Sequence, residues 1–177
     1  MLRSVNDKPA IYISFGSLGS GDIDLLKRLI DVTGSMQIRA LINVGDYMDE
    51  YDLDTLPENV HIESWYPQPS VIPQMDMVIH HGGNNSFTEC LYFGKPAIIM
   101  PYVWDGHDNA TRVEETGHGF KMHRSNWEPE ELKAKIKSCL NDQIMAAKMT
   151  ATSTFMQKSN GTERAASLLD QVMREHG

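Results

Sequence analysis

The residues of this sequence that are best suited to chemistry gather in one short segment, His81-Gly82-Gly83-Asn84-Asn85-Ser86-Phe87-Thr88-Glu89. The segment follows an apolar run at 75–80, which predicts a buried strand, and it leads into a predicted helix at 86–93. A helix N-terminus presents unpaired N–H groups and a partial positive charge, and glycine lets the backbone approach a phosphate closely. Glu89, one helical turn further on, offers an acceptor for sugar hydroxyls. The segment therefore predicts a nucleoside diphosphate site with a contact to the ribose.

The elements that must position this segment are predicted strands that alternate with predicted helices. The strands are expected at residues 10–15, 38–44, 60–64, 76–80, 97–100 and 119–122. The helices are expected from the N-cap Asp22 to Gly34, at 86–93 up to Gly94, at 108–116 up to Gly117, and from Glu128 onward with breaks near Asn141 and Asn160-Gly161. Most of the strands are apolar on both faces, which predicts an α/β fold around a parallel sheet that is covered on both sides.

Four loops rich in glycine, proline and polar residues follow predicted strands, at 16–21, 65–69, 81–86 and 101–109. In an open parallel sheet, ligands bind in the crevice at the carboxyl ends of the strands. Because all four loops lie at that end, we expect them to converge on one site.

Composition narrows the choice of partners. The 177 residues fit one domain, and the formal net charge of −8 argues against a nucleic-acid polymer as a ligand. The longest apolar run, around 97–100, is interrupted by Pro101 and is too short to span a bilayer, and the polar residues at 7–9 interrupt any secretory signal. Cys90 and Cys139 lie in no metal-ligand spacing. We therefore expect a cytoplasmic protein with reduced cysteines.

Several motifs follow one another along the chain: Phe15-Gly16-Ser17, Trp65-Tyr66-Pro67-Gln68, His81 through Glu89, Pro101 with Asp105, Asn109 and Ala110, and Arg164-Ala165-Ala166. In this order they resemble FGS, W-x-P-Q, H-x-G-x-N-S-x-x-E, P-x-x-x-D-Q-x-x-N-A and the closing helix of the C-terminal, donor-binding domain of GT-B glycosyltransferases. The resemblance extends over nearly the whole chain. It is strongest to the group of UDP-glycosyltransferases, plant secondary-metabolite glucosyltransferases and bacterial macrolide or antibiotic glycosyltransferases.

The resemblance implies a fold and a function. The fold is a Rossmann-like, doubly wound parallel sheet of about six strands, which forms the C-terminal half of a GT-B fold. The function is to bind a UDP- or dTDP-sugar, as the donor half of an inverting, metal-independent hexosyltransferase that acts on a small-molecule hydroxyl. In this family the acceptor oxygen attacks the anomeric carbon directly. Here His81 and the helix N-terminus would stabilise the leaving diphosphate in place of a metal ion, with no cofactor.

The resemblance also assigns roles to matching positions. Trp65 stacks on the base, Gln68 lies near the base and ribose, Glu89 binds the ribose hydroxyls, and Asp105 binds hydroxyls of the donor sugar. The diphosphate is held by a set of small and polar residues, Ser17, His81, Gly83, Asn85 and Ser86.

One position departs from the family pattern, because Gly106 stands where the family usually has Gln. The missing amide removes a hydrogen bond to the sugar, so the identity of the sugar is left open. His107 and Asp108 are the neighbouring residues that could compensate.

Each assigned residue also has a purely structural explanation. His81 and Asp105 could cap the following helices, Trp65 could belong to the core, Glu89 could be a solvated helix charge, and Ser17 could belong to a simple turn. The family context favours binding for all of them except Ser17, for which the alternatives are balanced.

His80 should point to the opposite face of its strand from His81, so we expect a structural role for it and no metal pair.

We expect residues 1–177 to form a single donor-binding domain, with 1–8 as a tail or severed linker and with the acceptor domain absent. The chain would then be an engineered domain, a truncated product or one subunit of a split transferase, and it would bind donor without transferring sugar until an acceptor domain is supplied in cis or in trans. A non-catalytic nucleotide-sugar binding module remains the alternative. An epimerase or hydrolase would need acid and base carboxylates in this cleft, and the candidates, Glu89 and Asp105, are already assigned to hydroxyl binding. A dehydrogenase-type dinucleotide site is disfavoured, because residues 16–19 lack the G-x-G-x-x-G spacing.

Overall fold

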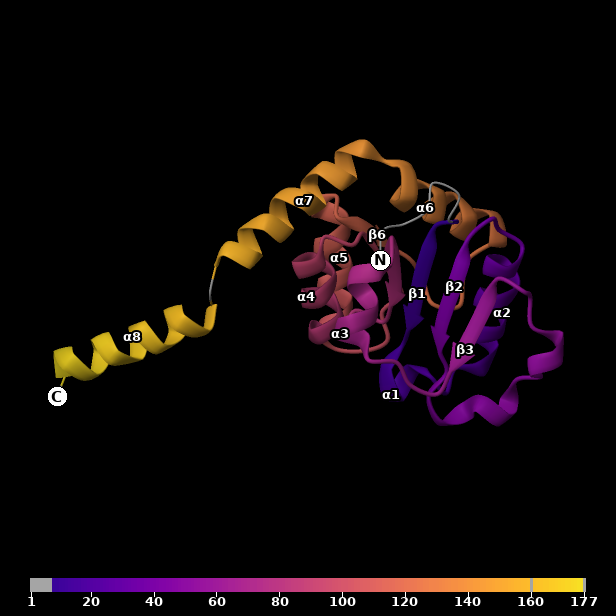
Figure 1. Ribbon diagram of the computed structural model, residues 1–177, viewed down its shortest axis with the longest axis horizontal. Coiled ribbons are helices and arrows are strands. Elements are labelled where there is room, and N and C mark those ends of the chain that lie inside the picture. Colours follow the sequence, from indigo (N-terminus) through magenta and orange to yellow (C-terminus); the bar gives the residue numbers. More distant parts are fainter. Residues whose placement is uncertain (1–7, 160, 177) are drawn as a thin grey trace.

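The computed structural model describes residues 8–159 and 161–176, so the expected tail at 1–8 lies almost wholly outside the described residues. Its centre is a six-stranded sheet in which every strand pair is parallel (Figure 1). The strands are β1 (Ala10–Ser14), β2 (Arg39–Asn43), β3 (Val60–Glu63), β4 (Met77–His80), β5 (Ala97–Ile99) and β6 (Gly119–Lys121). Their order in the sheet is β3-β2-β1-β4-β5-β6, so the direction of winding reverses between β1 and β4. A ligand crevice is expected at this reversal.

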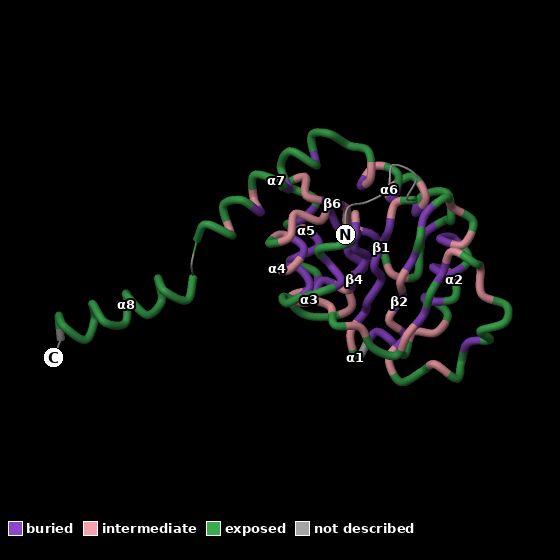
Figure 2. The backbone as a smooth tube through the Cα atoms, in the orientation of Figure 1, coloured by how far each residue is buried: buried purple, intermediate pink, exposed green. Residues whose placement is uncertain are grey.

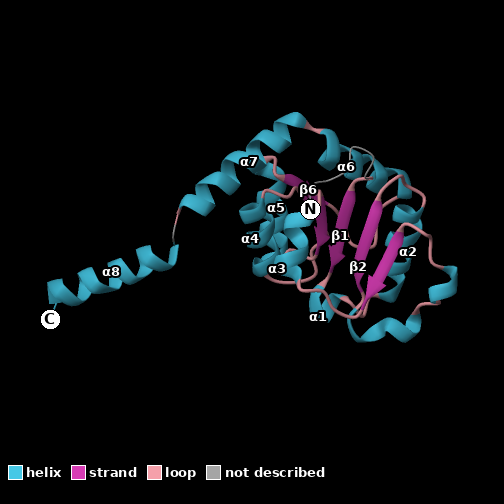
Figure 3. Cartoon of the chain, in the orientation of Figure 1, coloured by secondary structure: helices cyan, strands magenta, loops and turns pink. Residues whose placement is uncertain are grey.

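Helices cover both faces of the sheet (Figure 3). The α-helices are α1 (Gly16–Gly19), α2 (Ile23–Gly34), α3 (Gln68–Val71), α4 (Asn84–Phe93), α5 (Asp105–Thr116), α6 (Pro129–Asn141), α7 (Gln143–Lys158) and α8 (Gly161–His176). Short 3-10 helices occupy η1 (Gly45–Glu50), η2 (Leu53–Thr55) and η3 (Ile72–Gln74). This arrangement confirms the predicted α/β fold with a parallel sheet covered on both sides.

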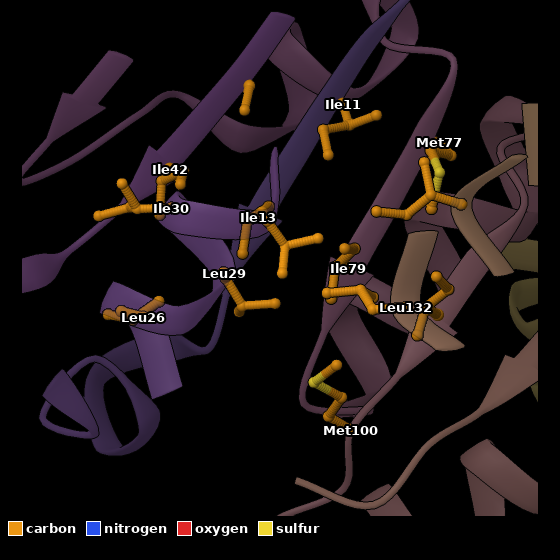
Figure 4. Close-up of a cluster of buried hydrophobic side chains, with 14 of the residues drawn as sticks. Ile11, Ile13, Leu26, Leu29, Ile30, Ile42, Met77, Ile79, Met100 and Leu132 are labelled. Atoms are coloured by element: carbon orange, nitrogen blue, oxygen red, sulfur yellow. The ribbon is translucent and has the colours of Figure 1, made fainter. Parts of the chain in front are cut away.

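Two buried clusters fill the layers on either side of the sheet. The larger cluster joins the strands to α2, α6 and α7, and Figure 4 shows Leu29 of α2 and Leu132 of α6 among its members, with Ile13 and Ile79 of the strands. The smaller cluster joins the strands to α3, α4 and α5 on the other face, through residues such as Phe87. Strands β1, β4 and β5 contribute to both clusters, because successive residues of a strand point to opposite faces of the sheet. Both clusters are apolar because helices cover the sheet on both sides.

The C-terminal helix α8 extends away from the sheet (Figures 1 and 2), and its residues 161–175 are exposed. Among the residues that the structure describes, no helix is long and apolar enough to cross a membrane.

Most predicted boundaries agree with the structure to within one or two residues. Asp22 accepts a hydrogen bond from the Leu25 N–H and caps α2, and Gly94 and Gly117 end α4 and α5 with φ of 68° and 72°. The left-handed conformation at these two helix ends favours glycine.

Three expectations about the loops were wrong. Helix α5 begins at Asp105 instead of residue 108, α4 begins at Asn84 instead of Ser86, and 16–19 forms one helical turn. The extra turn of α5 forms because the N–H groups of Gly106 and His107 donate to carbonyls three residues earlier. Local propensity does not predict this, since glycine disfavours a helix and contacts within the fold decide.

Candidate functional site

The predicted loop at 65–69 lies beside α4 through Gln68, and the other three predicted loops meet at the carboxyl ends of β1, β4 and β5. They surround a cavity of about 260 Å³, lined by Phe15, Gly16, Ser17, Gly19, His81, Tyr102, Val103, Trp104 and Asp105. A larger cavity of about 490 Å³ involves Pro9, Asp76 and Pro96, which adjoin the amino ends of the strands. We place the site at the smaller cavity, because ligands of parallel sheets bind at the carboxyl ends.

Helix α4 directs its N-terminus toward this region. It begins at Asn84, directly after the Gly82-Gly83 turn, and Gly82 has a φ of +89° that favours glycine. The backbone N–H of Asn84 donates to a carboxylate oxygen of Asp105 at 3.1 Å. A negative charge therefore already lies at the end of the helix that attracts anions.

His81 is half-buried between two glycines. A Cβ atom on Gly83 would lie 2.5 Å from the His81 Nε2 atom, and one on Gly16 would lie 3.1 Å from its Cε1 atom. These glycines leave room for the ring. Burial lowers the pKa of His81, against the opposing effects of the Ser14 backbone and the Asp105 carboxylate. Its Nδ1 atom is buried without a hydrogen bond of good geometry in the described part of the chain.

Gln68, Ser86 and Glu89 form a hydrogen-bonded group. The amide nitrogen of Gln68 donates to the Ser86 hydroxyl oxygen at 3.0 Å and to the Glu89 carboxylate at 2.6 Å. These contacts place the residues after β3 beside α4, although β3 and β4 are separated by two strands in the sheet. The structure thus brings together three of the predicted site residues.

Three predicted residues, Ser17, Trp65 and Asn85, remain exposed. Trp65 is 70 % exposed, so the core alternative for it was wrong. The Asn85 side chain is also exposed, and neither side chain makes a hydrogen bond within residues 8–159 and 161–176. An exposed indole is available for stacking, and that role stays a prediction.

His80 is fully buried, and its Nδ1 atom accepts the Gly82 N–H at 3.0 Å. Its ring is perpendicular to that of His81, with the centroids 6.4 Å apart. Burial lowers the pKa of His80 to about 3, with a smaller contribution from His81. The neutral ring therefore supports the Gly82-Gly83 turn, which agrees with the structural role predicted for it.

Sequence reasoning assigned no role to Asn109, although it belongs to one of the quoted motifs. Its side chain is buried, and the amide nitrogen donates to the Gly82 carbonyl at 2.8 Å and to the Asn84 side-chain oxygen at 3.0 Å. Asn109 therefore ties α5 to the turn that precedes α4. The spacing of four residues from Asp105 was the available signal, since it places both side chains on one face of a helix.

The sequence alone does not decide whether Trp104 belongs to the packing of its loop or forms a wall of the sugar pocket. It is 78 % exposed and has φ 49°, the only positive value for a non-glycine residue in the described chain. It lines the cavity, so the wall alternative is favoured over loop packing.

Gly106 is in close contact with the turn after β4. A Cβ atom built on Gly106 would lie 2.7 Å from the His81 carbonyl oxygen. A larger residue therefore requires a backbone shift, which gives the absence of the family Gln a steric cause in this chain.

The fold and this site define a Rossmann-like donor domain of the kind found in GT-B glycosyltransferases. Residues 27–167 match the family model described as the C-terminal domain of erythromycin biosynthesis protein CIII-like proteins, and the chain belongs to this family.

Three known proteins that resemble the chain are each about twice its length. NDP-glycosyltransferase YjiC of Bacillus subtilis (strain 168) is 25 % identical over 99 % of this chain and 45 % of its own length. The kitacinnamycin glycotransferase structure is 24 % identical, with a TM-score of 0.88 over 97 % of this chain and 44 % of its own. Spinosyn rhamnosyltransferase SpnG complexed with thymidine diphosphate is 21 % identical, with a TM-score of 0.74 over 84 % of this chain and 41 % of its own. The chain thus spans about half the length of these relatives.

No group of three or more His, Cys, Asp or Glu side chains that could hold a metal ion occurs among the residues that the structure describes. Cys90 and Cys139 are both buried and free.

Proposed function

We propose that the chain binds a UDP- or dTDP-sugar as the donor half of an inverting, metal-independent glycosyltransferase. The observation that carries the proposal is the N-terminus of α4 at the reversal point of the sheet, where the Asn84 N–H already holds the Asp105 carboxylate. A diphosphate satisfies the same N–H groups and the same partial charge. Family membership and the similar structure with thymidine diphosphate support the ligand class.

The roles of the residues follow from their positions. The diphosphate binds at the α4 N-terminus, against Ser17, His81, Gly83, Asn85 and Ser86. Trp65 stacks on the base, while Gln68 holds Glu89 toward the ribose. Asp105 leaves Asn84 when the diphosphate arrives and binds the hydroxyls of the sugar.

Transfer would place negative charge on the leaving diphosphate. His81 and the helix N-terminus would stabilise that charge without a metal ion. The acceptor is a small-molecule hydroxyl, and it requires a second domain in cis or in trans, because the chain spans only about half of its relatives. Residues 1–177 form a single donor domain, with 1–8 as a tail or severed linker. The two free cysteines support a cytoplasmic location.

Calorimetry tests the binding step. UDP, dTDP and ADP are titrated into the chain, into the variants His81→Ala and Trp65→Ala, and into Trp127→Phe, a buried control outside the lining of the cavity. We expect one pyrimidine diphosphate to bind in the micromolar range, with at least about tenfold weaker binding in both site variants. Binding that survives both variants, or that favours ADP, would contradict the proposal.

A nucleotide-sugar binding module without chemistry is the second candidate, since the described site contains no unassigned acid–base pair. Addition of an acceptor domain in trans separates the two candidates. Recovered transfer supports the enzyme half, and binding without transfer supports the module.

A further inference from the structure

A second cavity, of about 330 Å³, shares Tyr102 with the cavity of the candidate site. It lies at the carboxyl ends of β5 and β6, and its lining is Pro101, Tyr102, His107, Lys121, Met122, His123, Arg124 and Ser125. The proposed function uses none of the basic residues in this lining. The first turn of α5 carries both Asp105 and His107, so the second cavity adjoins the position proposed for the donor sugar.

The lining is basic, although the protein as a whole has a formal net charge of −8. Lys121 and Arg124 are the two cationic side chains of the lining, and two histidines lie beside them. Asp22 and Glu114 are the nearby acids: Asp22 lies 3.5 Å from Arg124, and Glu114 accepts the Lys121 backbone N–H at 3.3 Å. Neither acid is among the described residues that line the cavity.

The two cations keep unused hydrogen-bonding capacity. The Lys121 ammonium donates to the Thr111 hydroxyl at 2.9 Å, a neutral partner that leaves its charge uncompensated. Arg124 stacks on the Tyr102 ring at 3.6 Å, and its Nη1 atom is buried without a hydrogen-bonding partner in the described chain. An ammonium has three donors and a guanidinium has five, so a further acceptor can be bound here.

We propose that this cavity binds a carboxylate on the donor sugar, so that the donor is a nucleotide-linked uronic acid. The inference rests on the proposed function, because that function places the sugar at Asp105. Arg124 already forms an ion pair with Asp22, but a hexose with a neutral hydroxymethyl group would leave the Lys121 ammonium without an anionic partner and the Arg124 Nη1 atom without a charged acceptor. A uronic acid presents a carboxylate on the same ring that offers hydroxyls to Asp105, and charge-assisted hydrogen bonds favour it over the neutral group.

The test compares matched donors on one base. UDP-glucose and UDP-glucuronate, or the thymidine pair if dTDP is the tighter nucleotide, are titrated into the chain at low and high salt. The test variant is His107→Gln with Lys121→Gln, which leaves the structural contacts of Arg124 intact. Lys158→Gln, an exposed site at the end of α7, is the control for loss of one positive charge. Thermal unfolding checks that each variant is folded.

We expect the glucuronate donor to bind at least about tenfold more tightly than the glucose donor, with a smaller ratio at high salt. The double variant should bring the ratio near one by weakening the binding of the glucuronate donor, while Lys158→Gln keeps the full ratio. Equal affinities in the unmodified chain, or a preference that survives the double variant, overturn the inference and leave the proposed function standing. Failure of every nucleotide to bind overturns both.

Discussion

The side-chain amide of Gln68 donates to the carboxylate of Glu89 at 2.6 Å, although the two residues lie 21 positions apart. One residue belongs to α3 after the strand β3, and the other belongs to α4 after β4. The contact fixes the orientation of Glu89 before any ligand is present. A carboxylate held in this way loses less side-chain entropy when it binds a ribose hydroxyl.

The variant Gln68→Ala should weaken binding of the preferred nucleotide roughly fivefold, or about 1 kcal/mol, because it releases Glu89 and the Ser86 hydroxyl. Calorimetry measures the effect. Gln74→Ala is the matched control, because the Gln74 amide donates to the Ser70 carbonyl and makes no hydrogen bond with the candidate site among the described residues. Unchanged affinity in Gln68→Ala would show that the contact has no part in binding.

The variant Asp105→Asn should separate the nucleotide from the sugar. Loss of the carboxylate at the α4 N-terminus removes a competitor for the diphosphate, so free UDP or dTDP should bind about threefold more tightly. The corresponding nucleotide sugar should gain nothing, because its hydroxyls lose their acceptor. Asp108→Asn in the first turn of the same helix is the control. An equal loss for both ligands in calorimetry would contradict the displacement of Asp105.

The variant Gly106→Gln should not restore the family pattern. Its Cβ atom would meet the His81 carbonyl oxygen at 2.7 Å, so we expect a loss of about 1–3 kcal/mol in the free energy of unfolding. Urea denaturation measures this loss. Gly161→Ala serves as the control, because a Cβ there meets nothing within 4 Å. Unchanged stability of Gly106→Gln would mean that the turn adapts without cost.

The stability of the protein should fall as the pH decreases below about 6.5, because of His80. Burial lowers its pKa from 6.5 to about 3, so the unfolded chain binds the proton first. The contribution of His80 is fully present above pH 6.5 and is lost toward pH 3, at up to about 1.4 kcal/mol per pH unit. Denaturation at a series of pH values measures the slope. His80→Asn keeps an acceptor for the Gly82 N–H and should flatten the slope, whereas an equal slope would assign it to other groups.

The fold could be predicted from the sequence because its signals are local. Apolar runs define the strands, Asp22 caps α2, and Gly94 and Gly117 end their helices through left-handed backbone conformations. The site could be placed at the carboxyl ends of the strands for the same reason, since the alternation of strand and helix puts four loops there.

The start of α5 could not be predicted, because the first turn of this helix contains a glycine. That turn is stabilised by contacts with another loop. The bond from Asn84 to Asp105, the two bonds of Asn109 and the contact of Gly106 with His81 all join residues more than 20 positions apart. Neither hydrophobic periodicity nor secondary-structure propensity predicts such contacts.

The sequence by itself determined the order of strands and helices, the glycine turn predicted to bind phosphate and the resemblance to donor domains. The tertiary structure decided which of those residues touch. It joined Gln68 to Glu89, placed Asp105 on the α4 N-terminus and gathered Lys121 and Arg124 around one cavity. The physical reason is that hydrogen bonds and steric contacts act over a few ångströms, so they depend on how distant segments pack and not on their spacing along the chain.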